Sequence, residues 1–183
     1  NVHARNKRLE LPSDLAADED IKQILLQERL RRSVFEAVTE RHVEALETLL
    51  AAGARCDFKD IKGSTAVHMG ASLGCGRILQ KLLSHGAHVD ARIVDTKWCP
   101  LHFAAQQGHL DAVVALLQGG AHVGSHDFEG RTPLHLAAEC GQFAVCQELL
   151  AHSAKSEAID AAGATALHLA AGSCHADVAL IRA

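Results

Sequence analysis

The chain has 183 residues, 48% of them hydrophobic but only 3% aromatic, and it has no tyrosine, a balance that favours closely packed helices over aromatic-rich sheets. The formal charge is −4 and the sequence has no strongly basic run, so it lacks the positive charge that direct nucleic-acid binding requires. No apolar run approaches the roughly 20 residues of a membrane-spanning helix, and the six cysteines are too scattered for a disulfide scaffold. We therefore expect an intracellular protein with reduced thiols, in the cytoplasm and/or the nucleus.

The first unit along the chain is atypical. Residues 11–16 read Leu-Pro-Ser-Asp-Leu-Ala, and an apolar stripe at helical spacing follows them at Ile21, Ile24 and Leu25. We assign residues 1–31 to a partial repeat that begins inside a loop.

The next unit, residues 32–59, is degenerate. Its second half, residues 42–54, has the pattern of the later units, but its opening at Phe35 has neither a capping residue nor a preceding loop. Only 21 residues separate Asp14 from Phe35, so about twelve residues of a full period are missing. We expect the helix that passes through Arg31 to run almost directly into this unit.

Four tetrapeptides then recur at intervals of 34, 33 and 33 residues. They are Thr65-Ala66-Val67-His68, Cys99-Pro100-Leu101-His102, Thr132-Pro133-Leu134-His135 and Thr165-Ala166-Leu167-His168. Self-similarity at this period indicates a repeat architecture. The corresponding units are residues 60–94, 95–126, 127–159 and 160–183, and the last of them stops inside its second helix.

Each tetrapeptide has the chemistry of a helix start. Thr132 can cap the first turn, and Pro133 occupies the first helical position, where its missing N–H costs nothing. His135 lies one turn further on and can share a hydrogen bond with Thr132. Ala137 and Ala138 allow neighbouring helices to approach closely, and Gly141 can adopt the left-handed conformation that ends the helix.

A second helix follows in each unit. Val145, Leu149 and Leu150 fall on one helical stripe, as do Ile78, Leu82 and Leu83. Neither helix of a unit could bury its apolar face alone, so the core must come from stacking between units.

The tetrapeptides, the alanine pairs and the Gly-Ala pairs at 86–87 and 120–121 resemble those of the ankyrin repeat family over essentially the whole chain. The resemblance implies an all-α solenoid of stacked helix-turn-helix units with short hairpin loops. We expect about six units, including partial ones at both ends. The resemblance to ankyrin repeats also implies a protein–protein interaction module, a scaffold or adaptor that binds its partner through the concave face and the hairpin tips.

The loop before Cys99 departs from the pattern. It holds one extra residue, and Lys97 stands where the other loops have glycine. Because a non-glycine residue is strained at positive φ, we expect a different turn here.

Thirteen histidines invite a metal hypothesis. The four in the tetrapeptides are explained by the helix starts, and the remainder lack the tight cysteine or acidic spacing of a zinc site. Cys140 and Cys146 are better explained as small buried hydrophobes. No local nucleophile motif or phosphate loop is present. We therefore predict no catalytic residue, no metal, no cofactor and no enzymatic activity.

Positions that the repeat framework leaves free are the candidates for partner contact. In the family, partners usually meet the hairpin tips and the first helices. Trp98 is the single tryptophan, and tryptophan and arginine are enriched at binding hot spots, although packing on a neighbouring hairpin would also explain it. The candidates are Trp98, Phe128, Arg131, Glu129, Lys62, Ser64, Gln106 and Gln107.

Several alternatives remain open. The array can be the targeting or regulatory segment of a larger enzyme or channel, or a linker between a membrane protein and the cytoskeleton. Both termini fall inside repeats, so we expect a piece of a longer protein. We predict a monomer whose partner is another protein of unknown identity, with no direct nucleic-acid binding and no membrane insertion.

Overall fold

The computed structural model describes residues 19–173, which contain nine α-helices and no β-strand. The helices are α1 (Glu19–Thr39), α2 (Val43–Ala51), α3 (Ala66–Ser72), α4 (Gly76–Ser84), α5 (Pro100–Gln107), α6 (Leu110–Gln118), α7 (Pro133–Glu139), α8 (Phe143–Ala151) and α9 (Ala166–Gly172). The expectations for the start of the first unit, including residues 11–16, and for the end of the last unit lie outside the described residues.

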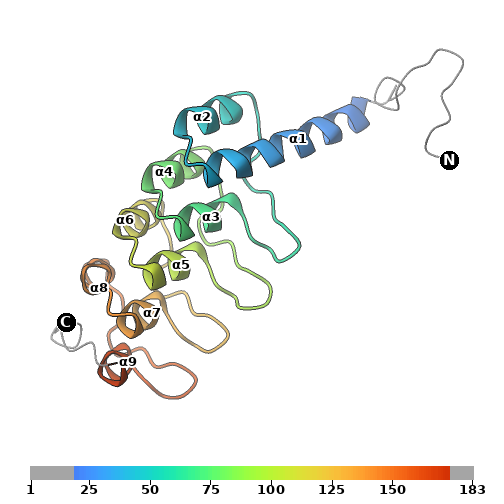
Figure 1. Cartoon of the computed structure of the whole chain (residues 1–183). Coiled ribbons are helices and arrows are strands. Elements are labelled where there is room, and N and C mark those ends of the chain that lie inside the picture. Colours follow the sequence, from blue (N-terminus) through green and yellow to red (C-terminus); the bar gives the residue numbers. More distant parts are fainter. Residues whose placement is uncertain (1–18, 174–183) are drawn as a thin grey trace, which may run out of the picture.

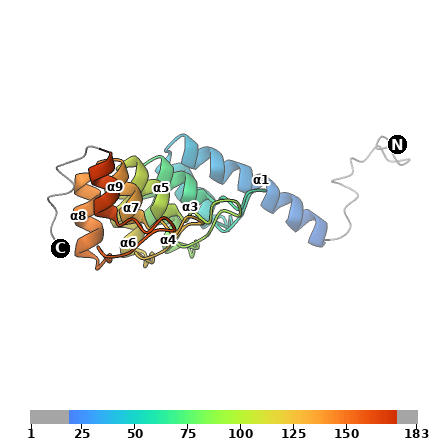
Figure 2. The same cartoon turned by 90° about the horizontal axis from the view of Figure 1, so that it is seen from below.

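The helices stack in two layers (Figures 1 and 2). The first helix of each unit packs on the next first helix, in the order α1, α3, α5, α7, α9, and the second helices pack in the order α2, α4, α6, α8. Hairpin loops project to one side of the array (Figure 1). The predicted all-α solenoid of stacked helix-turn-helix units is confirmed.

Stacking supplies the core, as the sequence predicts. In α7, Ala137 and Ala138 are almost fully buried between neighbouring first helices. In α8, Val145, Cys146 and Leu149 are buried in the same way. Small residues on the first helices and larger aliphatic residues on the second helices therefore fill one continuous core.

Helix α1 pairs with α2 at the start of the described array. It is continuous for 21 residues and spans residues 31 and 32, where the sequence pattern predicts the limit between the first two units. Val34, Ala37 and Val38 in its last part are buried in the core, whereas its first part extends past the stacked helices (Figures 1 and 2). The helix expected through Arg31 into the next unit is thus observed.

The turn before α5 differs from the others, as expected. Main-chain bonds close it between Ile93 and Trp98, five positions apart, whereas the equivalent bonds join residues four positions apart at Asp127 and Arg131. The expectation that Lys97 avoids positive φ is nevertheless wrong, because its φ is 58°. The extra residue lengthens the turn, but the residue before Trp98, which is Lys97, still has the left-handed conformation that Gly130 has before Arg131.

Candidate partner-binding surface

The helix starts use the predicted capping motif in four units. In each, the main-chain N–H of the first tetrapeptide residue donates to Nδ1 of the histidine, at 3.1–3.2 Å, and the side chain of the first residue lies 2.8–3.0 Å from the same nitrogen. Cys99 takes this place in one unit through its sulfur. The tetrapeptide histidines therefore have a structural role, as predicted.

Three of these histidines also tie each unit to the next hairpin. Because Nδ1 accepts a main-chain N–H, the hydrogen of the neutral ring is on Nε2, which donates to a carbonyl oxygen of the following loop. These bonds join His68 to Trp98 (3.3 Å), His102 to Arg131 (3.2 Å) and His135 to Ala164 (3.1 Å). Each tetrapeptide thus positions the hairpin next to it.

Burial favours the uncharged form of two of these rings, those of His68 and His102. Desolvation lowers the pKa of His68, and it lowers the pKa of the fully buried His102 to about 4, although the hydrogen bond to the Arg131 carbonyl acts in the opposite direction. Protonation would place a second donor against the main-chain N–H that Nδ1 accepts. His68 and His102 are consequently unsuited to act as general bases near neutral pH.

Aspartates organise three of the four hairpin turns. One carboxylate oxygen accepts the main-chain N–H groups two and four positions further along, at 2.8–2.9 Å, in the turns that begin at Asp60, Asp127 and Asp160. The longer turn instead has Thr96, whose hydroxyl accepts the N–H of Trp98. The turns are therefore held by local side-chain bonds.

Main-chain bonds join consecutive hairpins into a ladder. The N–H groups of Val94, Phe128 and Ala161 donate to the carbonyl oxygens of Lys62, Thr96 and Glu129 in the preceding hairpin, at 2.9, 3.2 and 2.8 Å. The hairpin tips are thereby held in register with one another.

Trp98 is bonded to the neighbouring hairpin. Its Nε1–H donates to Oδ2 of Asp127 at 3.1 Å, and its ring packs edge to face on Phe103 with centroids 4.9 Å apart. The side chain is half-buried, so both ring and nitrogen have structural partners. The packing on a neighbouring hairpin that the sequence left open for Trp98 is therefore present.

Arg131 belongs to the same cluster. Its Nε and Nη2 donate to Oδ2 of the buried Asp127 at 3.0 and 2.9 Å, and its Nη1 lies 3.2 Å from a carboxylate oxygen of the exposed Glu129. Burial by itself would raise the pKa of Asp127, but the hydrogen bonds from the main chain and the guanidinium of Arg131 outweigh it and lower the pKa. Arg131 consequently stabilises a buried carboxylate and has only part of its surface free.

The other candidates fall into two places. Lys62, Ser64, Phe128 and Glu129 lie on hairpins, whereas Gln106 and Gln107 lie at the opposite end of α5 from the hairpin that precedes it. The carbonyl oxygen of Gln106 accepts Nε2–H of Gln142, and Gln107 is exposed. The structure thus brings the hairpin candidates together and leaves the two glutamines apart from them.

Sequence reasoning missed two members of the hairpin surface. Ile61 is 99% exposed and Val94 is 68% exposed, and both occupy the tip position that Phe128, at 59%, occupies on its own hairpin. Lys97 lies with its ammonium nitrogen 4.5 Å from the Phe128 ring centroid. The sequence pattern that marks this tip position is an apolar residue directly after the turn aspartate, as in Asp60-Ile61. The extra residue in the longer turn obscures this pattern at Val94. We call Ile61, Val94 and Phe128 the tip row.

The cysteines differ in exposure. Burial raises the pKa of the Cys146 thiol to about 12, which agrees with its role as a small hydrophobe. The same interpretation is wrong for Cys140, which is exposed because it ends α7 at the loop.

Within residues 19–173, the structure places no three histidine, cysteine or acidic side chains where they could hold a metal ion together. Across the same part of the chain, no helix combines the length and the apolar composition that a membrane span requires.

A family model described as ankyrin repeats in three copies matches residues 34–127 and 101–181. The chain belongs to the ankyrin repeat family. The tetrapeptides, hairpins and helix pairs described above are therefore ankyrin repeats, which are protein-interaction modules.

Individual relatives share about a third of their residues with the matched part of the ankyrin array. This chain is 32% identical over 120 residues to the ankyrin repeat protein nuc-2 of Neurospora crassa, a match that covers 64% of this chain and 11% of nuc-2. It is 33% identical over 95 residues to human cyclin-dependent kinase inhibitor 2A, covering 52% and 60%. It is 34% identical over 88 residues to palmitoyltransferase Hip14 of Drosophila melanogaster, covering 48% and 14%. The matches thus span less than two thirds of each relative.

Proposed function

We propose that this ankyrin array is a scaffold or adaptor that recognises a partner protein through its hairpin tips and the first helices beside them. The observation that carries the proposal is the tip row, in which Ile61, Val94 and Phe128 expose apolar side chains at one position of three successive hairpins. Soluble proteins rarely leave large apolar side chains in a regular row unless the row is covered by something. An intracellular partner, in the cytoplasm and/or the nucleus, and a monomeric array are part of the proposal.

The hairpins are suited to this task because they are held before a partner arrives. The turn aspartates and the ladder between hairpins fix the main chain, so binding orders little of it. A preorganised surface loses less conformational entropy on association and binds more tightly for the same contacts.

Polar candidates surround the tip row in this proposal. Lys62, Ser64 and Glu129 would contact the partner directly, and Arg131 would do so with the part of its guanidinium that Asp127 leaves free. Trp98 acts behind the row by fixing the hairpin of Phe128. Gln106 and Gln107 take part only for a partner that extends along α5.

The names of the relatives support a protein partner. Cyclin-dependent kinase inhibitor 2A and cyclin-dependent kinase 4 inhibitor B are named for an action on another protein, and they match about half of this chain. The match to palmitoyltransferase Hip14 favours a second candidate, in which the array is the targeting or regulatory segment of a larger enzyme. Under that candidate the tip row binds the substrate protein or a regulatory partner of the enzyme.

The test compares two phenylalanines that are both exposed. Phe128 lies in the tip row, and Phe143, 41% exposed, begins α8 in the other layer. Quantitative affinity capture from cell extract with the Phe128→Ser and Ile61→Ser double variant should lose the proteins that wild type captures, whereas Phe143→Ser should retain them. Retention of every partner by the double variant would refute a role for the tip row.

A further inference from the structure

The layer of second helices has a regular surface at its helix starts. The residue before each helix bridges back to the preceding unit in two cases: His109 Nε2 donates to the carbonyl oxygen of Ser72 at 3.0 Å, and Gln142 Nε2 donates to that of Gln106 at 3.3 Å. The first residue of these helices is large and partly exposed, namely Leu110 in α6 and Phe143 in α8. These two positions together cover the junction between consecutive units.

Helix α4 lacks both features. Cys75 stands at the bridging position, and the hydrogen bond of its sulfur goes to the carbonyl oxygen of Leu73 in its own loop, at 3.7 Å. Gly76 stands where α6 and α8 have Leu110 and Phe143. In the described residues no side chain of α4 therefore bridges back to α1.

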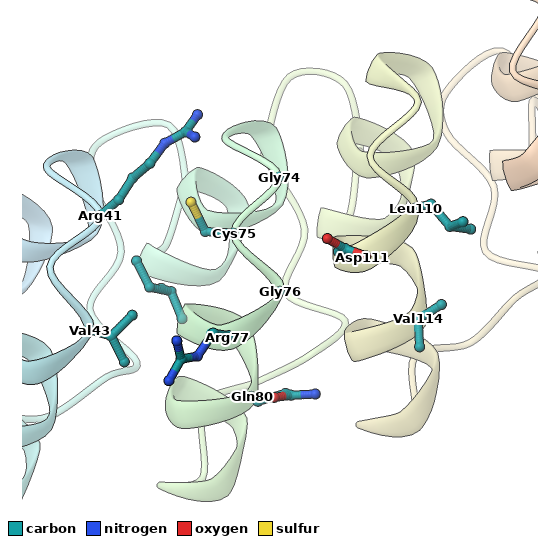
Figure 3. Close-up of a pocket in the computed structure, with 11 residues that line it drawn as sticks. Arg41, Val43, Gly74, Cys75, Gly76, Arg77, Gln80, Leu110, Asp111 and Val114 are labelled. Carbon is teal, nitrogen blue, oxygen red and sulfur yellow. The ribbon is translucent and has the colours of Figure 1, made fainter.

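A hollow of about 490 Å³ lies at this junction, between α2, α4 and α6 (Figure 3). Gly76 lies on its lining and lets α6 pack closely on the start of α4, because a Cβ there would lie 2.7 Å from the main-chain oxygen of Asp111. The close approach of α6 to α4 thus excludes every other residue at position 76. The volume falls within the range of about 300–1,000 Å³ that is usual for ligand sites.

The lining has an apolar part and a basic part. Val43, Leu110 and Val114 contribute apolar side chains from α2 and α6. Arg77 extends toward Val43 across the hollow (Figure 3), and Arg41 is tethered by one nitrogen to the carbonyl oxygen of Leu73 at 3.0 Å.

Both guanidinium groups are available to an external carboxylate. Among residues 19–173 neither Arg41 nor Arg77 forms an ion pair, although other exposed arginines such as Arg55 do. The lining itself has one carboxylate, that of Asp111 on the α6 wall, and the Glu47 carboxylate of α2, which interacts with Arg77, is already bonded to Lys81. The charge balance of the lining therefore favours an acidic occupant.

We propose that this hollow is a second protein-binding site, which receives a peptide segment with one large apolar side chain flanked by carboxylates. The apolar side chain would pack against Val43, Leu110 and Val114, and the carboxylates would pair with Arg77 and Arg41. The site lies at the loop between α3 and α4, whereas the hairpins lead into the opposite ends of the first helices. It is thus independent of the tip row, and the two sites can be occupied together.

The test uses a heptapeptide of alternating glutamates and apolar residues, Glu-Leu-Glu-Phe-Glu-Leu-Glu, and its counterpart with lysine in place of glutamate. Titration of the full chain, followed by NMR, should shift the amide signals of Gly74, Gly76 and Arg77 with the acidic peptide and not with the basic one. Arg77→Glu should weaken binding about tenfold or more, because it removes one favourable charge pair and adds a repulsive one.

A pair of matched charge variants distinguishes the hollow from general attraction to the surface. Gln80 is exposed and lines the hollow, so Gln80→Glu adds a carboxylate beside the two arginines with little change of shape and should weaken binding of the acidic peptide. Gln107→Glu adds the same charge at an exposed position on α5, outside the hollow, and should leave binding unchanged, as should Phe128→Ser in the tip row. Unchanged binding by Gln80→Glu, equal binding of the basic peptide, or no shift with either peptide at millimolar concentration would overturn the proposal.

Discussion

At the scale of single residues, His68, His102 and His135 perform the same task in successive repeats. Each accepts a main-chain N–H on Nδ1 at its own helix start and donates from Nε2 to the next hairpin. A single neutral side chain therefore joins local capping to the contact between units. For His68 and His102, whose pKa values burial lowers, the protonation state is accordingly linked to the stability of the array.

Acidification should destabilise the protein through His102. Its pKa is about 4 in the folded state and about 6.5 in an unfolded chain, so between these values the unfolded chain binds more protons. The contribution of His102 to the free energy of unfolding is fully present above about pH 6.5. It falls by about 3 kcal/mol as the pH drops toward 4. NMR titration of the His102 ring should give a midpoint near pH 4, and a midpoint near 6.5 would contradict the neutral, buried assignment.

Trp98 should contribute to stability, because its Nε1–H bonds to a buried carboxylate. Trp98→Phe keeps an aromatic ring beside Phe103 but removes the donor to Asp127, and hydrogen bonds to charged groups contribute about 1.5–3 kcal/mol. Urea unfolding should show a loss of about that size. Phe128→Leu, at an exposed tip, should change stability by only about 0.5 kcal/mol. Equal effects of the two substitutions would show that the bond to Asp127 contributes little.

The sequence predicts some of these roles and not others. The pairing of Thr132 with His135 is local, at a separation of three residues, and follows from helix-start chemistry alone. The bond from Trp98 to Asp127 joins residues 29 positions apart on different hairpins. Its existence depends on how the hairpins stack, which single-sequence patterns do not specify.

At the scale of elements, the hairpins depend on close main-chain approach. A Cβ on Gly130 would lie 3.0 Å from the main-chain nitrogen of Ala161 in the next hairpin, whereas a Cβ on Gly163 would meet nothing within 4 Å. Both glycines have positive φ, 75° and 77°, so both pay the same backbone strain when replaced.

Two alanine substitutions should therefore separate backbone strain from packing between hairpins. Gly163→Ala should cost about 1–2 kcal/mol from the left-handed conformation alone. Gly130→Ala should cost more, by about 1 kcal/mol, because the ladder bond between Ala161 and Glu129 must also shift. Thermal or urea unfolding of the two variants measures the difference, and equal losses would mean that the hairpins tolerate separation.

The elements were predictable to the extent that the repeat is regular. The helices from α3 to α9 follow from the tetrapeptides and the apolar stripes. The continuous helix α1 follows from the short spacing between Asp14 and Phe35. The conformation of Lys97 was not predictable, because the neighbouring hairpins hold a turn that its side chain alone disfavours. The tip row was likewise not predictable, because the one-residue insertion obscures the position of Val94 between those of Ile61 and Phe128.

At the scale of the whole molecule, stacking divides the array into surfaces with different tasks. The hairpins and first helices present the tip row, and the second helices present a basic and apolar hollow where α4 begins with Gly76. A buried framework of small and aliphatic residues holds both surfaces, so exposed residues can differ between ankyrin proteins without loss of the fold. Under the two proposals above, the array joins two partners, as an adaptor would.

Hydrogen-exchange mass spectrometry of the full chain, with and without a captured partner, tests the central proposal most directly. The tip row predicts that a partner slows exchange in residues 57–64, 93–98 and 127–131 and in the adjoining starts of α3, α5 and α7, with little change along α6 and α8. Slower exchange confined to the second helices, with the three hairpins unchanged, would contradict recognition through the hairpin tips.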